Sequence, residues 1–255
     1  MTDLVLSLVV PTYNEKETIP TLAEKVFASL DGAGISGELV VVDDNSPDGT
    51  AELAESLNEK YNNRIRVVKR SGKLGLSTAV IAGWKAGTGK ILGVIDCDLS
   101  HDPNILPDMV YSITDGGADI AMGSRYVKGG GVRNWPWYRR FTSWVAIMMG
   151  RAICPVLDVT SGYMLMKREC IEGAELNPIG FKINLEVLVK GNYKTVTEVP
   201  FIFEDRLAGK SKFGGGEIVN YLKHLWSLFG YCREHHPQHK RIPYTPFPRK
   251  TEQAQ

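Results

Sequence analysis

The sequence predicts an α/β domain in which one mostly parallel sheet is flanked by helices. Over the first hundred residues, short apolar runs alternate with helical patterns, as in 39–42, 77–86 and 91–95. Strands that are apolar throughout fit a sheet with both faces covered, because each strand then buries both of its sides. A chain of 255 residues can form one large domain of this kind, and the sequence shows neither an internal repeat nor a clear linker.

The elements follow in order along the chain. The first strand is the apolar run 4–10, which Pro11 ends, and apolar residues at near-helical spacing follow it up to Leu30. Turn residues at 46–49 lead into a second helix. Later strands are short apolar runs, and the last helix carries an apolar stripe. The predicted strands are 4–10, 39–42, 66–69, 91–95, 119–123, 163–167 and 195–199, and the predicted helices are 20–30, one that reaches 61, 77–86, 102–112 and 217–230.

Composition and charge exclude several classes of protein. The formal net charge is +1, whereas general nucleic-acid binders carry a strongly basic face, so we expect no nucleic-acid partner. The four cysteines lie far apart, which argues against zinc or disulfides and favours reduced thiols in the cytoplasm. The N-terminus runs straight into a strand, so we expect no secretory signal. Arg151 and Pro155 interrupt the apolar run 141–157, which we interpret as a core or interface helix rather than a membrane span.

Polar side chains follow three of the predicted strands, at 11–15, 43–46 and 96–98. If the strands are parallel, these segments converge on the edge of the sheet where ligands bind. Asp96 and Asp98 come directly after a buried strand, and paired carboxylates of this kind suit Mg²⁺ or Mn²⁺. Such an ion would neutralise a leaving diphosphate. An isolated pair is more often a solvated turn, but the position of this one favours a metal site.

Two phosphate-binding motifs do not fit. Gly89-Lys90 suggests a P-loop, but Trp84 stands at the first glycine position and a strand follows, whereas a P-loop feeds a helix. The place of a glycine-rich dinucleotide fingerprint is taken by residues 11–15. ATPase and NAD-dependent dehydrogenase activities are therefore not expected.

A series of motifs resembles the family 2 inverting glycosyltransferases, and within them the dolichol-phosphate (polyprenol-phosphate) mannose synthases. The similarity covers roughly residues 4–231, with motifs in order at 10–15, 42–50, 73–76, 96–101, 123–126, 134–136, 160–163, 198–200, 206 and 209–212. It implies a GT-A-type, Rossmann-like single domain that transfers mannose from GDP-mannose to a polyprenyl phosphate with inversion. UDP-glucose as donor, a non-catalytic nucleotide-sugar-binding subunit and a nucleotidyltransferase are the alternatives, although the last would need a glycine- and arginine-rich loop after the first strand.

The resemblance also implies residue roles. The residues that would contact the nucleotide sugar are Pro11, Tyr13, Glu15, Val42, Asp44, Asp96, Cys97, Asp98, Arg206 and Lys212. The implied catalytic residues are Asp96, Asp98, Arg125 and Arg139; the two arginines would hold the acceptor phosphate, with Lys182 as a further candidate. Asp96 and Asp98 would hold the Mg²⁺ or Mn²⁺, with Ser100 as a doubtful third ligand. One of Asp43 and Asp44 is expected to serve the turn, and His101 to pack or cap a helix rather than bind metal.

The resemblance divides the chain into a catalytic domain over 1–216, an amphipathic helix over 217–232 and a basic, proline-containing tail over 233–255. Residues 1–100 would be the nucleotide-binding half and 101–216 the acceptor half. The helix would pack either on the core or on a membrane surface, and the tail would be disordered or loosely docked. A lipid acceptor without a spanning helix implies attachment to the cytoplasmic face of a membrane, directly or through a separate small membrane subunit.

Overall fold

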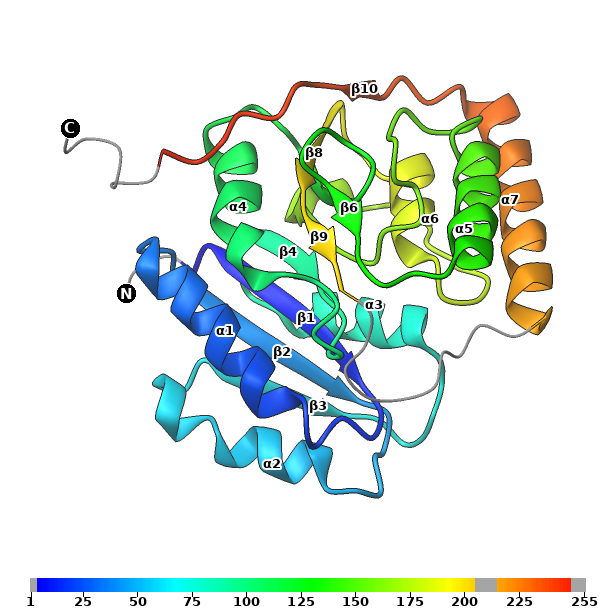
Figure 1. The fold of residues 1–255 in the computed structure, drawn as a ribbon. Coiled ribbons are helices and arrows are strands. Elements are labelled where there is room, and N and C mark those ends of the chain that lie inside the picture. The colour runs from blue at the N-terminus through cyan, green and yellow to red at the C-terminus, as the bar shows by residue number, and fades with distance from the viewer. Residues whose placement is uncertain (1–3, 205–214, 249–255) are drawn as a thin grey trace.

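The fold is a central sheet with helices on both faces (Figure 1). A computed structural model describes residues 4–204 and 215–248. Within these residues, eight strands form the sheet in the order β10-β8-β5-β7-β4-β1-β2-β3, and every neighbouring pair is parallel except those that include β7. These strands are β1 (Leu6–Thr12), β2 (Gly37–Asp43), β3 (Ile65–Lys69), β4 (Ile91–Val94), β5 (Ile120–Ser124), β7 (Met164–Lys167), β8 (Thr195–Pro200) and β10 (Lys240–Arg241). The predicted α/β fold with a mostly parallel sheet is confirmed.

Two hydrophobic clusters fill the space between the sheet and its helices. Successive residues of β1 point into opposite clusters, Leu8 and Val10 into one and Val9 into the other, which explains why the buried strands are apolar throughout. The helices on the first face are α1 (Ile19–Gly32), α2 (Thr50–Ser56) and α4 (Leu106–Thr114), and those on the second are α3 (Leu76–Ala86), α5 (Trp137–Gly150), α6 (Ile183–Lys190) and α7 (Gly215–His235). Short 3₁₀ turns lie at Glu59–Tyr61, Pro103–Ile105 and Arg168–Cys170, and β6 (Gly131–Val132) pairs with β9 (Ile202–Phe203) in a separate ribbon.

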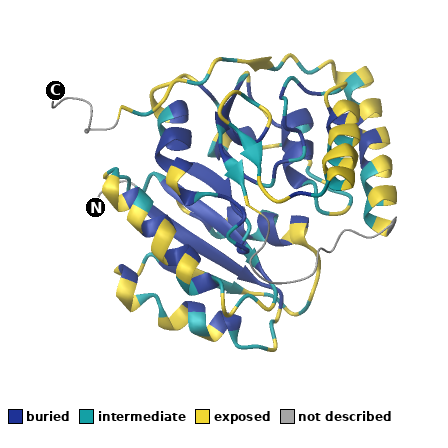
Figure 2. Ribbon diagram, in the orientation of Figure 1, coloured by how far each residue is buried: buried dark blue, intermediate teal, exposed yellow. Residues whose placement is uncertain are grey.

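The helix α5 lies largely outside the core. Ile147 and Gly150 are its buried residues, whereas Trp137, Phe141 and Trp144 are more than half exposed. Figure 2 shows exposed residues along α5 and the neighbouring α7 at one end of the sheet. The run 141–157, predicted to be a core or interface helix, thus contacts the core through Ile147 and the residues after α5, while much of α5 is exposed; an interface role for the exposed part stays a prediction. Among the helices described here, none combines the length and the apolar character that a membrane span requires.

The chain after α7 follows the edge of the sheet (Figure 1). Residues of β10 pair in parallel with β8, and the Ile242 amide donates to the Val196 carbonyl at 2.8 Å. Further along, the Tyr244 hydroxyl and the Phe247 amide both donate to Asp108 of α4. Our expectation of a loosely docked tail is thus wrong for residues 240–247, while 249–255 lie outside the described residues. The reason is that β8 would otherwise present unpaired backbone groups, and backbone pairing tolerates a polar composition.

The packing of α3 on the sheet requires a glycine. A methyl group on Gly83 would clash with Val9 Cγ1 and lie 2.9 Å from Val42 Cγ2. Gly83→Ala should therefore lower the free energy of unfolding by about 1–2 kcal/mol, since overpacking outweighs the better helix propensity of alanine. Gly32→Ala at the end of α1 is the control, because nothing lies within 4 Å of its added methyl group. Chemical denaturation measures both, and equal stability of the two variants would contradict the tight packing.

Candidate functional site

The carboxyl ends of the parallel strands bring the predicted residues to one edge of the sheet, as expected for a ligand site in an open α/β sheet. Tyr13 and Glu15 follow β1, Asp44 follows β2, and Arg125 follows β5. The strand β4, which Asp96 and Asp98 follow, lies between β1 and β7 in the sheet. The two carboxylates therefore stand between an aromatic and acidic part of the edge and a cationic part.

Asp43 and Asp44 have different roles at the end of β2. Asp43 accepts hydrogen bonds from the Thr12 hydroxyl at 3.0 Å and from the amide and hydroxyl of Ser46 at 2.8 and 2.6 Å. It is the turn residue of the pair. Asp44 is buried and instead forms an ion pair with Arg70, whose Nη1 lies 2.7 Å from Asp44 Oδ1.

Cations that we did not predict cover this part of the edge. The ammonium group of Lys73 lies 4.4 Å from the centre of the Tyr13 ring, and Arg70 holds Asp44. Glu15 accepts from the Thr18 hydroxyl at 2.8 Å. The sequence gives a weak signal for Lys73, in the motif 73–76, but none for Arg70, since its contact depends on the pairing of β2 with β3.

Two predicted contact residues lie beneath the edge rather than on it. The side chain of Val42 is fully buried and packs against α3, so only its backbone can face a ligand. Cys97 is also buried, with its sulfur 3.4 Å from the Thr18 hydroxyl, and burial raises the pKa of its thiol. Pro11 is half-buried at the end of β1. The predicted contacts of Val42 and Cys97 with a nucleotide sugar would therefore have to come from their backbone, and they stay predictions.

The carboxylate of Asp98 is oriented by Ser100. Asp98 Oδ1 accepts from the Ser100 amide at 3.1 Å and from the Ser100 hydroxyl at 2.5 Å. Leu99 between them has a φ of 60°, a left-handed conformation that turns the chain back on itself. Ser100 is thus placed to position Asp98, while the carboxylate of Asp96 remains 31% exposed.

The donor set at the end of β4 fits a hard divalent cation. Within the described parts of the chain, no cluster of three or more His, Cys, Asp or Glu side chains is arranged to hold a metal ion. Asp96 and Asp98 nevertheless supply carboxylate oxygens, the ligands that Mg²⁺ and Mn²⁺ favour. Such ions usually keep water molecules and share substrate phosphates, so two protein carboxylates are enough.

His101 packs behind the acidic pair. It is 2% exposed, with Nδ1 3.7 Å from Asp96 Oδ2, and its ring lies against Tyr163, Phe201 and Phe203. Burial lowers the pKa of this imidazole. These contacts agree with the packing role that we expected for His101. The carboxylates of Asp96 and Asp98 are therefore the groups after β4 that we consider as metal ligands.

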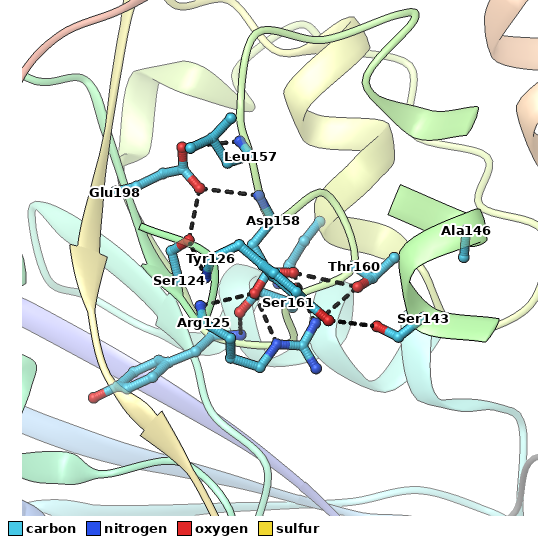
Figure 3. Close-up of polar contacts among 12 residues, drawn as sticks. Ser124, Arg125, Tyr126, Ser143, Ala146, Leu157, Asp158, Thr160, Ser161 and Glu198 are labelled. Atoms are coloured by element: carbon cyan, nitrogen blue, oxygen red, sulfur yellow. Dashed lines mark hydrogen bonds and ion pairs between the residues drawn. The ribbon is translucent and has the colours of Figure 1, made fainter. Parts of the chain in front are cut away.

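A buried ion pair fixes Arg125 at the cationic end of the site (Figure 3). Its Nε and Nη2 each lie 2.7 Å from an oxygen of Asp158, and its backbone amide donates to the same carboxylate at 3.0 Å. Asp158 is fully buried; burial raises the pKa of its carboxyl, but the Arg125 guanidinium more than offsets this and holds the pKa below its usual range. Arg125 also donates to the Thr160 hydroxyl at 2.8 Å. Sequence reasoning assigned no role to Asp158 or Thr160.

The other two predicted phosphate ligands lie close to Arg125. The guanidinium group of Arg139 lies 4.3 Å from the centre of the Trp135 ring, and that of Arg125 lies 5.3 Å from the same point. Lys182 donates to the Thr160 carbonyl at 2.8 Å, and burial together with Arg125 lowers the pKa of its amine to about 8. The structure thus brings together Arg125, Arg139 and Lys182, whereas Arg206 and Lys212 lie outside the described residues.

Comparison with known proteins identifies the family. Residues 7–173 match the protein family described as "Glycosyl transferase family 2". The chain belongs to this family. It is 47% identical to a dolichol-phosphate mannosyltransferase of Pyrococcus furiosus over 229 residues, which are 88% of this chain but only 63% of that protein. It is 36% identical to a dolichol-phosphate mannosyltransferase of Saccharomyces cerevisiae over 234 residues, which are 88% of this chain and 86% of that protein. The predicted resemblance is confirmed.

Solved structures of other transferases share the fold. A mannosyltransferase of Pyrobaculum calidifontis, solved in complex with GDP-Man and Mn²⁺, has a TM-score of 0.63 at 17% identity, over 92% of this chain and 65% of that chain. A glucosyl-3-phosphoglycerate synthase of Mycobacterium tuberculosis, solved with Mn²⁺, UDP and phosphoglyceric acid, has a TM-score of 0.61 at 22% identity, over 88% of this chain and 77% of that chain. At these identities the similarity shows the fold, and it agrees with the predicted GT-A type.

The electrostatics of the cationic end can be tested directly. The amine of Lys182 should lose its proton as the pH rises through about 8, because burial and Arg125 disfavour its charged form. Exposed lysines ordinarily titrate near 10.4, well above this range. An NMR titration of the lysine side-chain nitrogens measures the difference, with Lys182→Gln identifying the signal. A Lys182 signal that titrates with the exposed lysines would contradict the buried position of this amine.

Proposed function

We propose that this protein is a metal-dependent inverting glycosyltransferase that transfers mannose from GDP-mannose to a polyprenyl phosphate. The order of groups along the sheet edge carries the proposal. Tyr13, Glu15 and Asp44 lie on the β1 and β2 side and Asp96 and Asp98 in the middle. A cationic cluster, of which Arg125 is the buried member, lies on the β5 side. A donor nucleotide, its diphosphate and the phosphate of a second substrate could bind to these three groups of residues in the same order along the edge.

The β1 and β2 side would bind the donor nucleotide. The Tyr13 ring offers a flat surface to a base, and the carboxylate of Glu15 can accept from the donor groups of a guanine or a ribose. Asp96 and Asp98 would hold the Mg²⁺ or Mn²⁺, with Ser100 fixing the orientation of Asp98. When bound, the ion would neutralise the charge of the leaving diphosphate. Arg206 and Lys212 are proposed to contact the same diphosphate.

The β5 side would bind the acceptor phosphate. A phosphate oxygen is already anionic near neutral pH, so the site needs no general base to activate it. It needs cations that hold the acceptor in line with the anomeric carbon, and Arg125, Arg139 and Lys182 supply them. Because Arg125 Nε is committed to Asp158, we expect Arg125 to act mainly as a fixed charge and Arg139 as the adaptable ligand.

UDP-glucose is the second candidate donor. One observation favours it: the same fold occurs in the M. tuberculosis enzyme whose solved structures contain UDP-glucose. The described residues near Tyr13 and Asp44 accept hydrogen bonds and present an aromatic ring, and neither feature is specific to one base. The donor assignment to GDP-mannose therefore depends on the two mannosyltransferase relatives.

Incubating the purified chain with radiolabelled GDP-mannose or UDP-glucose, Mg²⁺ or Mn²⁺ and a polyprenyl phosphate tests the proposal. We expect organic-extractable label from GDP-mannose alone, and its loss on chelation of the metal. Asp98→Asn should reduce turnover at least about 100-fold, because one metal ligand and its charge are weakened. Label from UDP-glucose alone would reassign the donor. Full activity of Asp98→Asn would contradict the metal site.

We also propose that α5 and α7 rest on a membrane surface. The two helices lie side by side, and the Tyr221 hydroxyl of α7 donates to the Ala146 carbonyl of α5 at 2.6 Å. The exposed apolar residues on them, which we call the α5–α7 face, are Trp137, Tyr138, Phe141, Trp144, Val145, Met148, Met149, Ile218, Val219, Leu222, Trp226 and Phe229. Exposed tryptophan and tyrosine suit the headgroup level, and α5 carries Arg139 and Arg140 but no acidic residue, which suits anionic lipids. Such a surface would place a lipid acceptor next to Arg139.

Replacing two aromatic residues of the α5–α7 face by Trp144→Glu and Trp226→Glu should weaken binding to vesicles of mixed neutral and anionic lipids by roughly tenfold or more, because buried indole area is lost and negative charge is added. Thr21→Glu with Ala28→Glu on exposed positions of α1 adds the same charge elsewhere and should leave binding unchanged. Co-sedimentation measures both. If neither the native chain nor the variants bind vesicles, a separate membrane subunit becomes the alternative.

A further inference from the structure

A second buried carboxylate lies behind the cationic end of the site. Glu198 of β8 has a fully buried side chain. Its Oε1 accepts from the Ser124 hydroxyl at 2.8 Å and from the Asp158 amide at 3.0 Å, and its Oε2 accepts from the Leu157 amide at 2.9 Å (Figure 3). Glu198 therefore fixes both the end of β5 and the start of the loop that carries Asp158.

The charge of Glu198 is matched by the last strand of the sheet. Arg241 of β10 places its Nε 2.7 Å from Glu198 Oε2. Its strand partner in β8 is Val196, so Glu198 lies two residues further on the same face of that strand. Among the described residues, Arg241 is the one cation that pairs with Glu198. The pairing of β10 with β8 thus places the guanidinium of Arg241 next to the buried carboxylate of Glu198.

These contacts form a continuous series from the sheet edge to the site. Arg241 contacts Glu198, Glu198 binds the amide of Asp158, and Asp158 binds the guanidinium of Arg125 through two oxygens. Every residue of this series except Arg241 is buried. Because neither solvent nor side-chain rotation can compensate in the closely packed interior, a displacement of one side chain should displace the next.

We propose that Arg241 is a positioning residue for the acceptor phosphate: it neutralises Glu198, which anchors the 157–158 segment and thereby sets the direction of Arg125. This inference rests on the proposed function, since it assigns the phosphate of that acceptor to Arg125. Only Glu198 is buried in this pair, and removing the cation that pairs with a buried carboxylate leaves its charge uncompensated. Without Arg241, Glu198 is expected to admit water or turn away, and the two amides that it binds lose a partner.

Arg241→Gln tests the proposal, with Lys240→Gln as the matched control. Lys240 lies next to Arg241 in β10, is exposed, and pairs with β8 through its backbone. We expect Arg241→Gln to raise the KM for the polyprenyl phosphate roughly tenfold, with the KM for GDP-mannose nearly unchanged, because only the acceptor end is disturbed. Lys240→Gln should change neither constant, and Arg241→Lys should recover part of the loss.

Hydrogen exchange supplies a readout that needs no catalysis. The amides of Leu157 and Asp158 should lose protection in Arg241→Gln but keep it in Lys240→Gln, since both donate to Glu198. If the native chain transfers no mannose, the proposed function fails while the exchange result still decides the role of Arg241. Should Arg241→Gln not fold, Arg241→Lys serves in its place, with a smaller loss of protection expected. Unchanged protection and unchanged acceptor KM would overturn the proposal.

Discussion

The strand β7 runs antiparallel to both of its neighbours, and that direction decides which residues meet at the edge of the sheet. Because β7 lies between β4 and β5 in reverse, its first residues meet the last residues of both strands at the same edge. The segment that precedes it, with Asp158 and Thr160, is thereby inserted between the acidic pair and Arg125. A methyl group on Gly162 would stand 3.1 Å from Asp96 Oδ2, which shows how closely this segment approaches the end of β4. An all-parallel sheet would have carried the same segment to the opposite edge.

Buried anions hold the cations of the site in fixed directions. Asp44 pairs with Arg70, and Asp158 with Arg125, and in each pair both side chains are almost completely removed from water. Such pairs contribute little net stability, because desolvation offsets most of their attraction. Their benefit is preorganisation: charges that are already oriented need not reorganise when an anionic group binds. Asp96, whose carboxylate is 31% exposed, and Arg139, which stacks on Trp135 and is partly exposed, contrast with these buried pairs.

The sequence was sufficient to predict a mostly parallel sheet, the positions of its first strands along the chain and the edge at which polar groups meet, because buried parallel strands and the residues that end them are local patterns. Through the family resemblance it also pointed to Asp96, Asp98 and Arg125, which the structure places at this edge and whose roles stay predictions. It could not separate Asp43 from Asp44, since that depends on where β3 places Arg70. Nor could it find Asp158, whose partner lies 33 residues earlier and is reached only through the reversed strand. The docking of residues 240–247 was missed because backbone pairing leaves no signature in a polar, proline-containing segment.

The position of β10 also has a consequence for how the chain folds. Chains emerge from their N-terminal end during synthesis, and domains fold as their parts become available. The strands β5, β7 and β8 are complete by Pro200, but the arginine that compensates Glu198 arrives some forty residues later. Until then the nascent sheet contains a carboxylate with no counter-ion and an open edge at β8. Ordering of the segment that holds Arg125 is therefore coupled to the synthesis of β10, so that a chain stalled before residue 240 would have its core strands and still lack the counter-ion of Glu198.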